Sequence, residues 1–278
     1  MSPHIGNDLS LVAVDLDGTL LTSAGTLAPR SAALLTQAAQ RGVHVILATT
    51  RLPDSVQGFC RQMDLHHPMI CINGAQIWGS PEGPLWASFC IPRAVALVIA
   101  QVADTHNWDL SITIDSMRYR RARSGQALGQ SGANRIIVPT NVEAIVGDPG
   151  RILVQQPEAI EPLRALCQAR FAKDCHTETH YASDGSAREL GIFARHADKG
   201  TALALVLARL AVRRERVLVI GDNLNDLPMF PYARVSVAMG NAPETVQQRA
   251  SMIAPSNDAE GVAWVLEAVG LAQGGAPT

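Results

Sequence analysis

A short apolar run that ends in two carboxylates constrains this chain more than any other feature of its sequence. Residues 11–14, Leu-Val-Ala-Val, lead directly into Asp15 and Asp17, and a glycine and a threonine follow. Because the run is continuously apolar, it predicts a strand buried on both faces, as in a parallel sheet. Side chains alternate along a strand, so Asp15 and Asp17 project the same way. Two carboxylates this close stay ionised together only around a cation; otherwise one pKa rises. The alternative is an acidic turn after a strand.

Composition restricts the class of protein that this chain can be. It has 278 residues, of which 47% are hydrophobic and 17% charged, enough for a large core in one large or two modest domains. The net charge of −2 argues against a nucleic-acid binder. The five cysteines have neither metal-finger nor disulfide spacing, which favours free thiols and a cytoplasmic location. The N-terminal ten residues lack a signal-peptide pattern, and no apolar run is long enough to span a membrane. We therefore expect neither a signal peptide nor a membrane-spanning helix.

Strand and helix patterns alternate on both sides of a differently built middle segment. Buried-strand patterns separated by helical ones predict a doubly wound, Rossmann-like α/β core with a parallel sheet, made of residues 1–83 and 191–278. Residues 84–190 mix strand and helix patterns and predict an inserted α+β domain. Insertion at a surface loop is well tolerated, so one core split by one insertion is the expected organisation.

Polar or glycine-rich residues follow the predicted core strands. The carboxyl ends of parallel strands share one edge of a sheet, so these residues can converge on one ligand. The candidates at this edge, besides the first two carboxylates, are Thr49, Thr50, Arg51, Asn73, Gly74, Lys199, Asp222, Asn225 and Asp226.

Each candidate also has a structural interpretation. Lys199 can be a solvated lysine at a helix start, although a cation there opposes the helix dipole. Asp222 and Asp226 can be turn or N-cap residues, and Thr49 can cap the helix that follows Pro53. Asn73 and the glycine after it can be simple turn residues.

Together these motifs resemble the haloacid dehalogenase-like hydrolase superfamily, and most closely its Cof-type branch of phosphatases with a large α/β cap. The resemblance covers the whole predicted core in the expected order. The four superfamily motifs correspond to residues 15–21, Thr49, Lys199 and residues 221–226, and the branch signatures to 73–75, 237–242, 257–258 and 261–263.

The resemblance implies a phosphatase that hydrolyses a small phosphorylated metabolite, a sugar phosphate or phosphorylated cofactor, through an aspartyl-phosphate. It implies Asp15 as the nucleophile, Asp17 as the general acid and base, and Lys199 as the cation that offsets phosphoryl charge. It also implies Mg²⁺ bound by Asp15, Asp222 and the backbone carbonyl of Asp17. A hard divalent cation suits this chemistry because it neutralises the repulsion between a carboxylate nucleophile and an anionic substrate.

The same resemblance implies a phosphate cradle and two supporting residues. The cradle would use the Thr49 hydroxyl, the backbone N–H groups of Leu16 and Thr50, and the Asn225 side chain. Thr50 stands where the branch usually has glycine, and we expect activity to survive because the N–H remains. The complete predicted substrate-binding set is Leu16, Thr49, Thr50, Asn73, Gly74, Lys199 and Asn225, with Asp226 and Arg51 in support.

The inserted domain is expected to close over the core and to set substrate specificity. Its basic cluster either recognises a second anionic group on the substrate or is a solvated strand edge that discourages aggregation. The cluster is Arg118, Arg120, Arg121 and Arg123. Further unranked candidates are His176, His180, Tyr181, Asp184 and Arg188.

Several other functions remain open on the sequence. The nearest are a dedicated sugar-phosphate phosphatase of the mannosyl-3-phosphoglycerate or sucrose-phosphate type, and a phosphomutase, although nothing indicates the bisphosphorylated activator that a mutase needs. A catalytically silent metabolite-binding protein of the same fold is disfavoured because the motif aspartates and lysine are all present. The expected partner is a small phosphorylated metabolite, with no nucleic acid or membrane, and the expected state is a monomer or homodimer.

Overall fold

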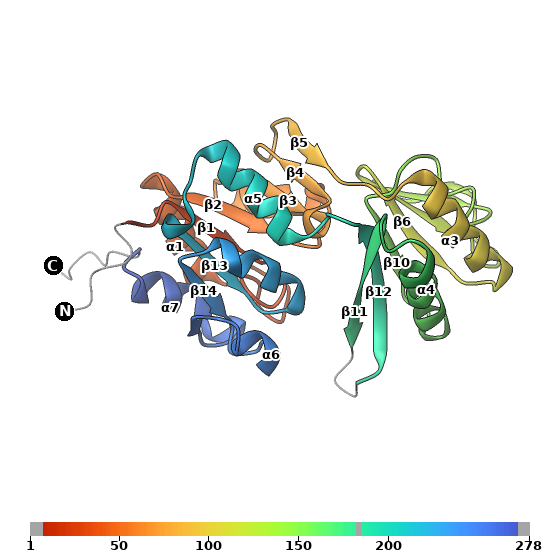
Figure 1. Ribbon diagram of the computed structural model, residues 1–278. Helices are drawn as coiled ribbons and strands as arrows, with labels where there is room; N and C mark the ends of the chain where they lie inside the picture. The colour runs from red at the N-terminus through yellow and green to blue at the C-terminus, as the bar shows by residue number, and fades with distance from the viewer. Residues whose placement is uncertain (1–7, 182–184, 272–278) are drawn as a thin grey trace. The chain divides into compact units, whose positions relative to one another are not determined.

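The computed structural model describes residues 8–181 and 185–271, and the chain forms two compact units. The first unit comprises the residues up to Ala87 and those from Asp198 onward, and the second is Ser88–Ala197. The second unit therefore interrupts the first only once, as an insertion does (Figure 1).

An eight-stranded sheet forms the centre of the first unit, in the order β15-β14-β13-β1-β2-β3-β4-β5. Neighbouring strands from β15 to β3 pair in parallel, and β4 pairs antiparallel with β3. The predicted doubly wound parallel core is thus confirmed, with β1 fully buried between β13 and β2. The strands are β1 (Leu11–Val14), β2 (His44–Ala48), β3 (Met69–Cys71), β4 (Gln76–Trp78), β5 (Leu85–Ser88), β13 (Val217–Gly221), β14 (Val235–Ala238) and β15 (Met252–Ile253).

The helices of this unit begin where the sequence supplies a first-turn proline or a capping side chain. Pro29 and Pro53 open α1 and α2, where a missing N–H costs nothing. Asp198 caps α5 by accepting a hydrogen bond from the Thr201 N–H at 2.8 Å. The helices are α1 (Pro29–Gln40), α2 (Pro53–Gln62), α5 (Lys199–Leu210), α6 (Glu244–Gln247) and α7 (Gly261–Ala268), with 3₁₀ turns η2 (Ile72–Gly74), η3 (Arg214–Arg216), η4 (Leu224–Tyr232) and η5 (Asn257–Ala259).

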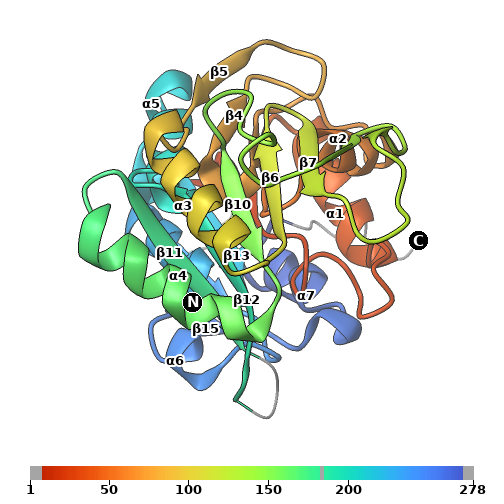
Figure 2. The same ribbon diagram turned by 90° about the vertical axis from the view of Figure 1, so that its right-hand side faces the viewer.

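A seven-stranded sheet with two helices on one face forms the second unit, which confirms the predicted α+β insertion (Figure 2). The strand order is β11-β12-β10-β6-β7-β9-β8, and only the β7–β9 pair is parallel. The elements are α3 (Arg93–Thr105), β6 (Leu110–Ile114), β7 (Met117–Arg121), β8 (Gly129–Gln130), β9 (Arg135–Val138), β10 (Arg151–Val154), α4 (Pro157–Arg170), β11 (Cys175–Tyr181) and β12 (Ala187–Ala194).

The helices are too short or too polar for a bilayer. Within residues 8–181 and 185–271, none could cross a membrane.

Candidate active site

The carboxyl ends of four neighbouring parallel strands bring the predicted motifs to one edge of the first sheet. The Asp15 N–H continues the β1 ladder by donating to the Ile220 carbonyl at 3.0 Å. The Thr49 N–H donates to the Ile70 carbonyl after β2, and the Asn73 N–H donates to the Thr49 carbonyl, both at 2.9 Å. The residues that follow the carboxyl end of each strand are called its tip below. Backbone hydrogen bonds hold these tips together, because each tip extends the hydrogen-bond ladder of the sheet.

A buried lysine joins two of the carboxylates at this edge. Lys199 Nζ lies 2.7 Å from Asp15 Oδ1 and 2.6 Å from Asp226 Oδ1, and the Lys199 side chain is 1% exposed. Burial alone would lower the pKa of Lys199, but the two carboxylates outweigh it and raise this pKa above its ordinary value. Lys199 is therefore a charged, fixed ammonium, and the alternative of a solvated helix-start lysine is wrong.

Asp226 anchors both this lysine and the loop after β13. Its Oδ2 accepts the backbone N–H groups of Asp222 and Asn223, each at 2.9 Å, while Lys199 binds its Oδ1. Gly221 makes room for this arrangement, since a Cβ at that position would lie 2.4 Å from the Asp226 carboxyl carbon. Both oxygens of Asp226 are thus engaged by the protein, which makes it a positioning residue.

Asp222 lies against the loop that follows β1. Thr19 Oγ1 donates to Asp222 Oδ1 at 2.9 Å. Gly18 has a φ of +83°, and a Cβ there would lie 2.3 Å from Asp222 Oδ2, so both its conformation and its lack of a side chain are needed. Burial and the nearby Asp226 charge raise the pKa of Asp222 from 3.8 to about 6.

The residues at this edge fit a hard divalent cation. One carboxylate oxygen from each of Asp15, Asp222 and Asp226 lies within 4.8 Å of the others. One ammonium, Lys199, faces these carboxylates, and burial raises the pKa of Asp15 well above its ordinary value despite that ammonium. Oxygen donors with uncompensated negative charge are what Mg²⁺ prefers. Since Asp226 is occupied by other donors, Asp15 and Asp222 are the side chains left to bind a metal.

Asp17 forms an ion pair with Arg51, whereas Asp15 contacts Lys199. The Asp17 carboxylate accepts two hydrogen bonds from Arg51, from Nε at 2.8 Å and from Nη2 at 2.6 Å, and its side chain is 52% exposed. The hydrogen bond to Asp17 is the largest of the effects that raise the pKa of Arg51. The structure therefore joins two predicted site residues that the sequence treated separately.

The tip after β2 is built around a fully buried threonine. Thr49 Oγ1 accepts the Arg51 N–H at 3.2 Å. The residue at the N-cap of α2 is Leu52, which has no side-chain capping bond, so the interpretation of Thr49 as a helix cap is wrong. Thr50, the residue that replaces the usual glycine, is half-buried beside it.

The tip after β3 contacts both the start of α5 and the loop after β13. Asn73 is buried, has a φ of +57°, and accepts a hydrogen bond from Asn225 Nδ2 at 3.1 Å. Gly74 has a φ of +92°, and a Cβ there would lie 2.3 Å from the Asp198 carbonyl oxygen. The structure thus gives Gly74 a packing function and brings Asn225 to the same edge as Thr49.

Two asparagines, Asn241 and Asn257, lie within the branch-signature ranges 237–242 and 257–258, and the sequence predicted no function for either. Asn241 Nδ2 donates to the Gly18 carbonyl at 2.8 Å, and Asn257 Nδ2 donates to the Leu21 carbonyl at 2.8 Å. The Asn257 N–H also donates to Asn241 Oδ1 at 3.1 Å. These amides secure the loop that carries the aspartates. Their only signal in the sequence was the resemblance itself.

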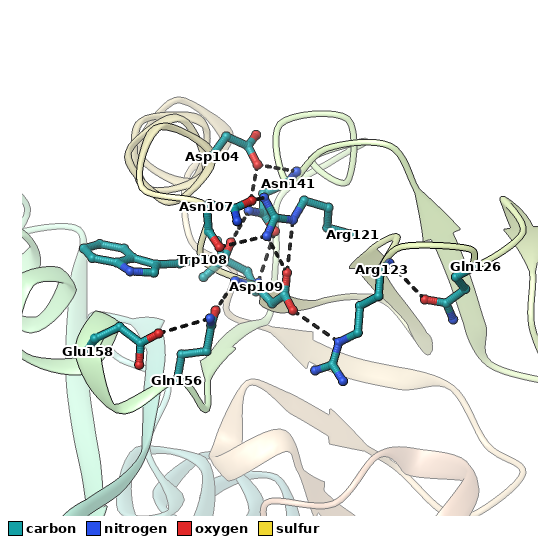
Figure 3. Close-up of polar contacts among 11 residues, drawn as sticks. Asp104, Asn107, Trp108, Asp109, Arg121, Arg123, Gln126, Asn141, Gln156 and Glu158 are labelled. Atoms are coloured by element: carbon teal, nitrogen blue, oxygen red, sulfur yellow. Dashed lines mark hydrogen bonds and ion pairs between the residues drawn. The ribbon is translucent and has the colours of Figure 1, made fainter.

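The predicted basic cluster of the second unit divides into two pairs. Arg121 Nη2 lies 2.7 Å and Arg123 Nε 3.3 Å from the Asp109 carboxylate, so these two are ion-paired (Figure 3). Arg118 and Arg120 lie on β7, which has β6 on one side and β9 on the other. The interpretation of the cluster as a solvated sheet edge is therefore wrong.

Of the remaining candidates of the second unit, the structure brings together only His180 and Arg188 among the described residues. His176 stacks on Phe193, with ring centroids 5.7 Å apart, and Tyr181 is exposed. His180 and Arg188 line a separate cavity of about 420 Å³. Asp184 lies outside the described residues.

Comparisons with known proteins agree on one family. The model of the haloacid dehalogenase-like hydrolases matches residues 12–266. The chain is 24% identical to pyridoxal phosphate phosphatase YbhA of Escherichia coli, over 91% of this chain and 96% of that protein. It is 27% identical to 5-amino-6-(5-phospho-D-ribitylamino)uracil phosphatase YitU of Bacillus subtilis, over 92% and 96%. The crystal structure of TM0651 from Thermotoga maritima superposes with a TM-score of 0.79 at 25% identity, over 94% and 97%.

Proposed function

The chain belongs to the haloacid dehalogenase-like hydrolase family and is a phosphatase, and we propose on that premise that it is a Mg²⁺-dependent enzyme that hydrolyses a sugar phosphate or a phosphorylated cofactor through an aspartyl-phosphate. The observation that carries the proposal is the buried Lys199, held between Asp15 and Asp226. A fixed ammonium beside a carboxylate at the edge of a parallel sheet is suited to stabilising a transferring phosphoryl group.

Asp15 acts as the nucleophile in this proposal. Its carboxylate oxygen forms a bond to phosphorus as the bond to the leaving alkoxide breaks, and Asp17 gives that alkoxide a proton. In the second half, Asp17 takes a proton from water, the water oxygen bonds to phosphorus, and the bond to Asp15 breaks. Inorganic phosphate leaves and both aspartates return to their starting states. Lys199 orients Asp15 and offsets negative charge in both halves.

The metal and the phosphate cradle use the remaining groups. When bound by Asp15, Asp222 and the backbone carbonyl of Asp17, Mg²⁺ supplies the positive charge that lets a carboxylate approach a phosphomonoester. The Thr49 hydroxyl, the Asn225 amide and the N–H groups of Leu16 and Thr50 bind the phosphoryl oxygens. The Leu16 N–H supports this assignment, because it donates no hydrogen bond to any described residue.

The inserted unit sets substrate specificity in this proposal. Two relatives are named for pyridoxal phosphate and for a phosphoribitylamino-uracil, both small phosphomonoesters, which supports a substrate of that size. We place the enzyme in the cytoplasm as a monomer or homodimer that acts on small metabolites. No feature of the described residues favours the mutase or the dedicated sugar-phosphate phosphatase alternatives.

A phosphate-release screen over small phosphomonoesters tests the proposal. It compares the unsubstituted chain with Asp15→Asn, each with Mg²⁺ and with a chelator. We expect turnover only for the unsubstituted chain with Mg²⁺. Equal turnover by Asp15→Asn would refute the nucleophile, and turnover that survives chelation would refute the metal dependence.

A further inference from the structure

Side chains from two distant strand tips support the loop that carries the first two carboxylates. This loop, residues 15–23, is called the aspartate loop below. The sheet order β15-β14-β13-β1 places β13 between β1 and the strands β14 and β15. Asn241 of the tip after β14 and Asn257 of the tip after β15 nevertheless donate to the carbonyls of Gly18 and Leu21, each at 2.8 Å. The aspartate loop therefore has a support that is separate from the ladder between β1 and β13.

The peptide that joins Gly18 to Thr19 is held at both of its polar ends. Its carbonyl accepts from Asn241 Nδ2 at 2.8 Å, and its N–H donates to the Leu16 carbonyl at 3.2 Å. Because a peptide is planar, two bonds on opposite edges fix both its position and its rotation. Such a hold matters at Gly18, since glycine rotates more freely than any other residue and here has a φ of +83°. The two bonds thus limit how far Asp17, the preceding residue, can move.

The amide of Asn241 has one orientation that satisfies both of its neighbours. Its Oδ1 accepts the Asn257 N–H at 3.1 Å, so its Nδ2 faces the Gly18 carbonyl. A flipped amide would set two acceptors against each other at Gly18 and two donors against each other at Asn257. Asparagine suits this position because one short side chain supplies both a donor and an acceptor. The N–H of Asn257 therefore determines which group of Asn241 reaches the aspartate loop.

The backbone beside Asn241 is fixed, although the residue is exposed. Gln247 Nε2 donates to the carbonyls of Gly240 at 3.2 Å and of Ala242 at 2.9 Å. A Cβ on Gly240 would lie 2.9 Å from the Ala254 carbonyl oxygen, so the tips after β14 and β15 pack directly on each other. The donor to the aspartate loop therefore comes from a rigid base rather than from a freely rotating part of the surface.

Asp17 is thereby held by two tips of the same sheet edge. Arg51 of the tip after β2 binds its carboxylate at 2.8 Å and 2.6 Å, and Asn241 of the tip after β14 fixes the main chain next to it. The Asp17 side chain is 52% exposed, so packing restrains it little. A group that transfers a proton must lie within hydrogen-bond reach of the reacting oxygen, and a misplacement of about 1 Å can cost about a hundredfold in rate.

We propose that Asn241, oriented by Asn257, is a positioning residue that holds Asp17 in place to protonate the leaving alkoxide. The inference rests on the proposed function, in which Asp17 is the general acid, and adds to it a residue from the far side of β13. Asn241 acts through the Gly18 carbonyl, so its removal should impair the proton transfer and leave the rest of the reaction largely unaffected.

Initial rates on two substrates test the inference. One is the alkyl phosphate that the phosphate-release screen finds to be turned over fastest, and the other is p-nitrophenyl phosphate, whose leaving group needs little help from an acid. Asn241→Ala should lower kcat on the alkyl phosphate about tenfold, the equivalent of one hydrogen bond, and on p-nitrophenyl phosphate about twofold or less. Asn241→Gln, which keeps a donor and an acceptor, should restore part of the loss.

The same substitution in the Asp17→Asn background distinguishes positioning from a general structural effect. There Asn241→Ala should lower the rate on the alkyl phosphate about twofold or less, because the residue that it positions no longer transfers a proton. A loss of equal size in both backgrounds would overturn the inference. So would equal losses on the two substrates, or an Asn241→Ala rate equal to that of the unsubstituted chain, which would mean that water replaces the amide.

The matched control is Gln248→Ala, which removes an exposed amide from the same connection between β14 and β15. Gln248 Nε2 donates to Glu244 Oε1 at 2.9 Å, and its loss should leave both rates unchanged. Amide hydrogen exchange gives a readout without turnover. Residues 17–21 should exchange about fivefold faster in Asn241→Ala than in Gln248→Ala, and equal exchange would overturn the inference. Urea midpoints of all variants check that they remain folded.

The proposed function and the inference fail in different ways. If the unsubstituted chain turns over neither substrate, the proposed function is refuted and the inference falls with it. If the unsubstituted chain is active, the ratio of the two rates and the Asp17→Asn background decide the role of Asn241 alone.

Discussion

Arg51 holds the carboxylate of Asp17 with one hydrogen bond to each oxygen. The two residues are 34 positions apart and follow neighbouring strands, β1 and β2. A bidentate guanidinium fixes both the position and the plane of a carboxylate. In the proposed mechanism Asp17 must lie beside the leaving oxygen, so Arg51 is a positioning residue for proton transfer.

The pairing of Arg51 with Asp17 predicts that the rate loss in variants of either residue depends on the leaving group of the substrate. Asp17→Asn should slow hydrolysis of an alkyl phosphate about a hundredfold, because an alkoxide needs a proton, and should slow that of p-nitrophenyl phosphate much less. Arg51→Met should show the same selectivity more weakly. Initial rates on the two substrates measure it. Arg61→Met, an exposed arginine on α2, is the matched control, and equal losses on both substrates would contradict the assignment.

Lys199 should be essential for stability as well as activity. Lys199→Met leaves Asp15 and Asp226 buried without their cation, and we expect a loss of about 3 kcal/mol in the free energy of unfolding. Arg213→Met, which breaks an exposed ion pair, should cost less than about 1 kcal/mol. Urea titration of both variants checks the difference. Similar midpoints would show that the buried pairs contribute little.

In the absence of metal, the free energy of unfolding should depend on the protonation of Asp222 and therefore on pH. The folded pKa of Asp222 is about 6 and its ordinary value is 3.8, so between these values only the folded state holds the proton. The free energy of unfolding therefore falls as pH rises through this window. Asp222→Asn should raise the Tm of metal-free protein at about pH 7 and change it little near about pH 4.

The same variant provides a test of metal binding. Mg²⁺ should raise the Tm of the unsubstituted chain at neutral pH, because a ligand that binds only the folded state stabilises it. Asp222→Asn should lose most of this gain. Thermal scans with and without Mg²⁺ measure both effects, and an equal Mg²⁺ response in the two proteins would exclude Asp222 as a metal ligand.

Alanine substitutions at two glycines with positive φ distinguish the cost of backbone strain from the cost of a steric clash. Gly42→Ala, with a φ of +87° and no atom within 4 Å of the added Cβ, should cost about 1–2 kcal/mol through strain alone. Gly74→Ala also forces a Cβ against the Asp198 carbonyl and should cost about 2 kcal/mol more. Unfolding of both variants tests this, and equal costs would mean that the tip after β3 relaxes freely.

The sequence by itself determined the family, the split core and the identity of the residues at the sheet edge. Asp15 follows a continuously apolar run, and such a run reports burial on both faces without reference to any distant residue. The order of the motifs then placed Thr49, Lys199 and Asp222 at strand or helix ends, because local patterns mark where elements stop.

Only the tertiary structure decided which of these residues touch. Lys199 reaches Asp15 across 184 positions, and Asp226 binds both Lys199 and the backbone N–H groups of Asp222 and Asn223. The pairing of Arg118 with Arg135 likewise depends on the register between β7 and β9, which the sequence did not reveal. Periodicity reports which side of an element is buried, whereas contacts across a sheet depend on strand order and register, which only the packing of the whole chain determines.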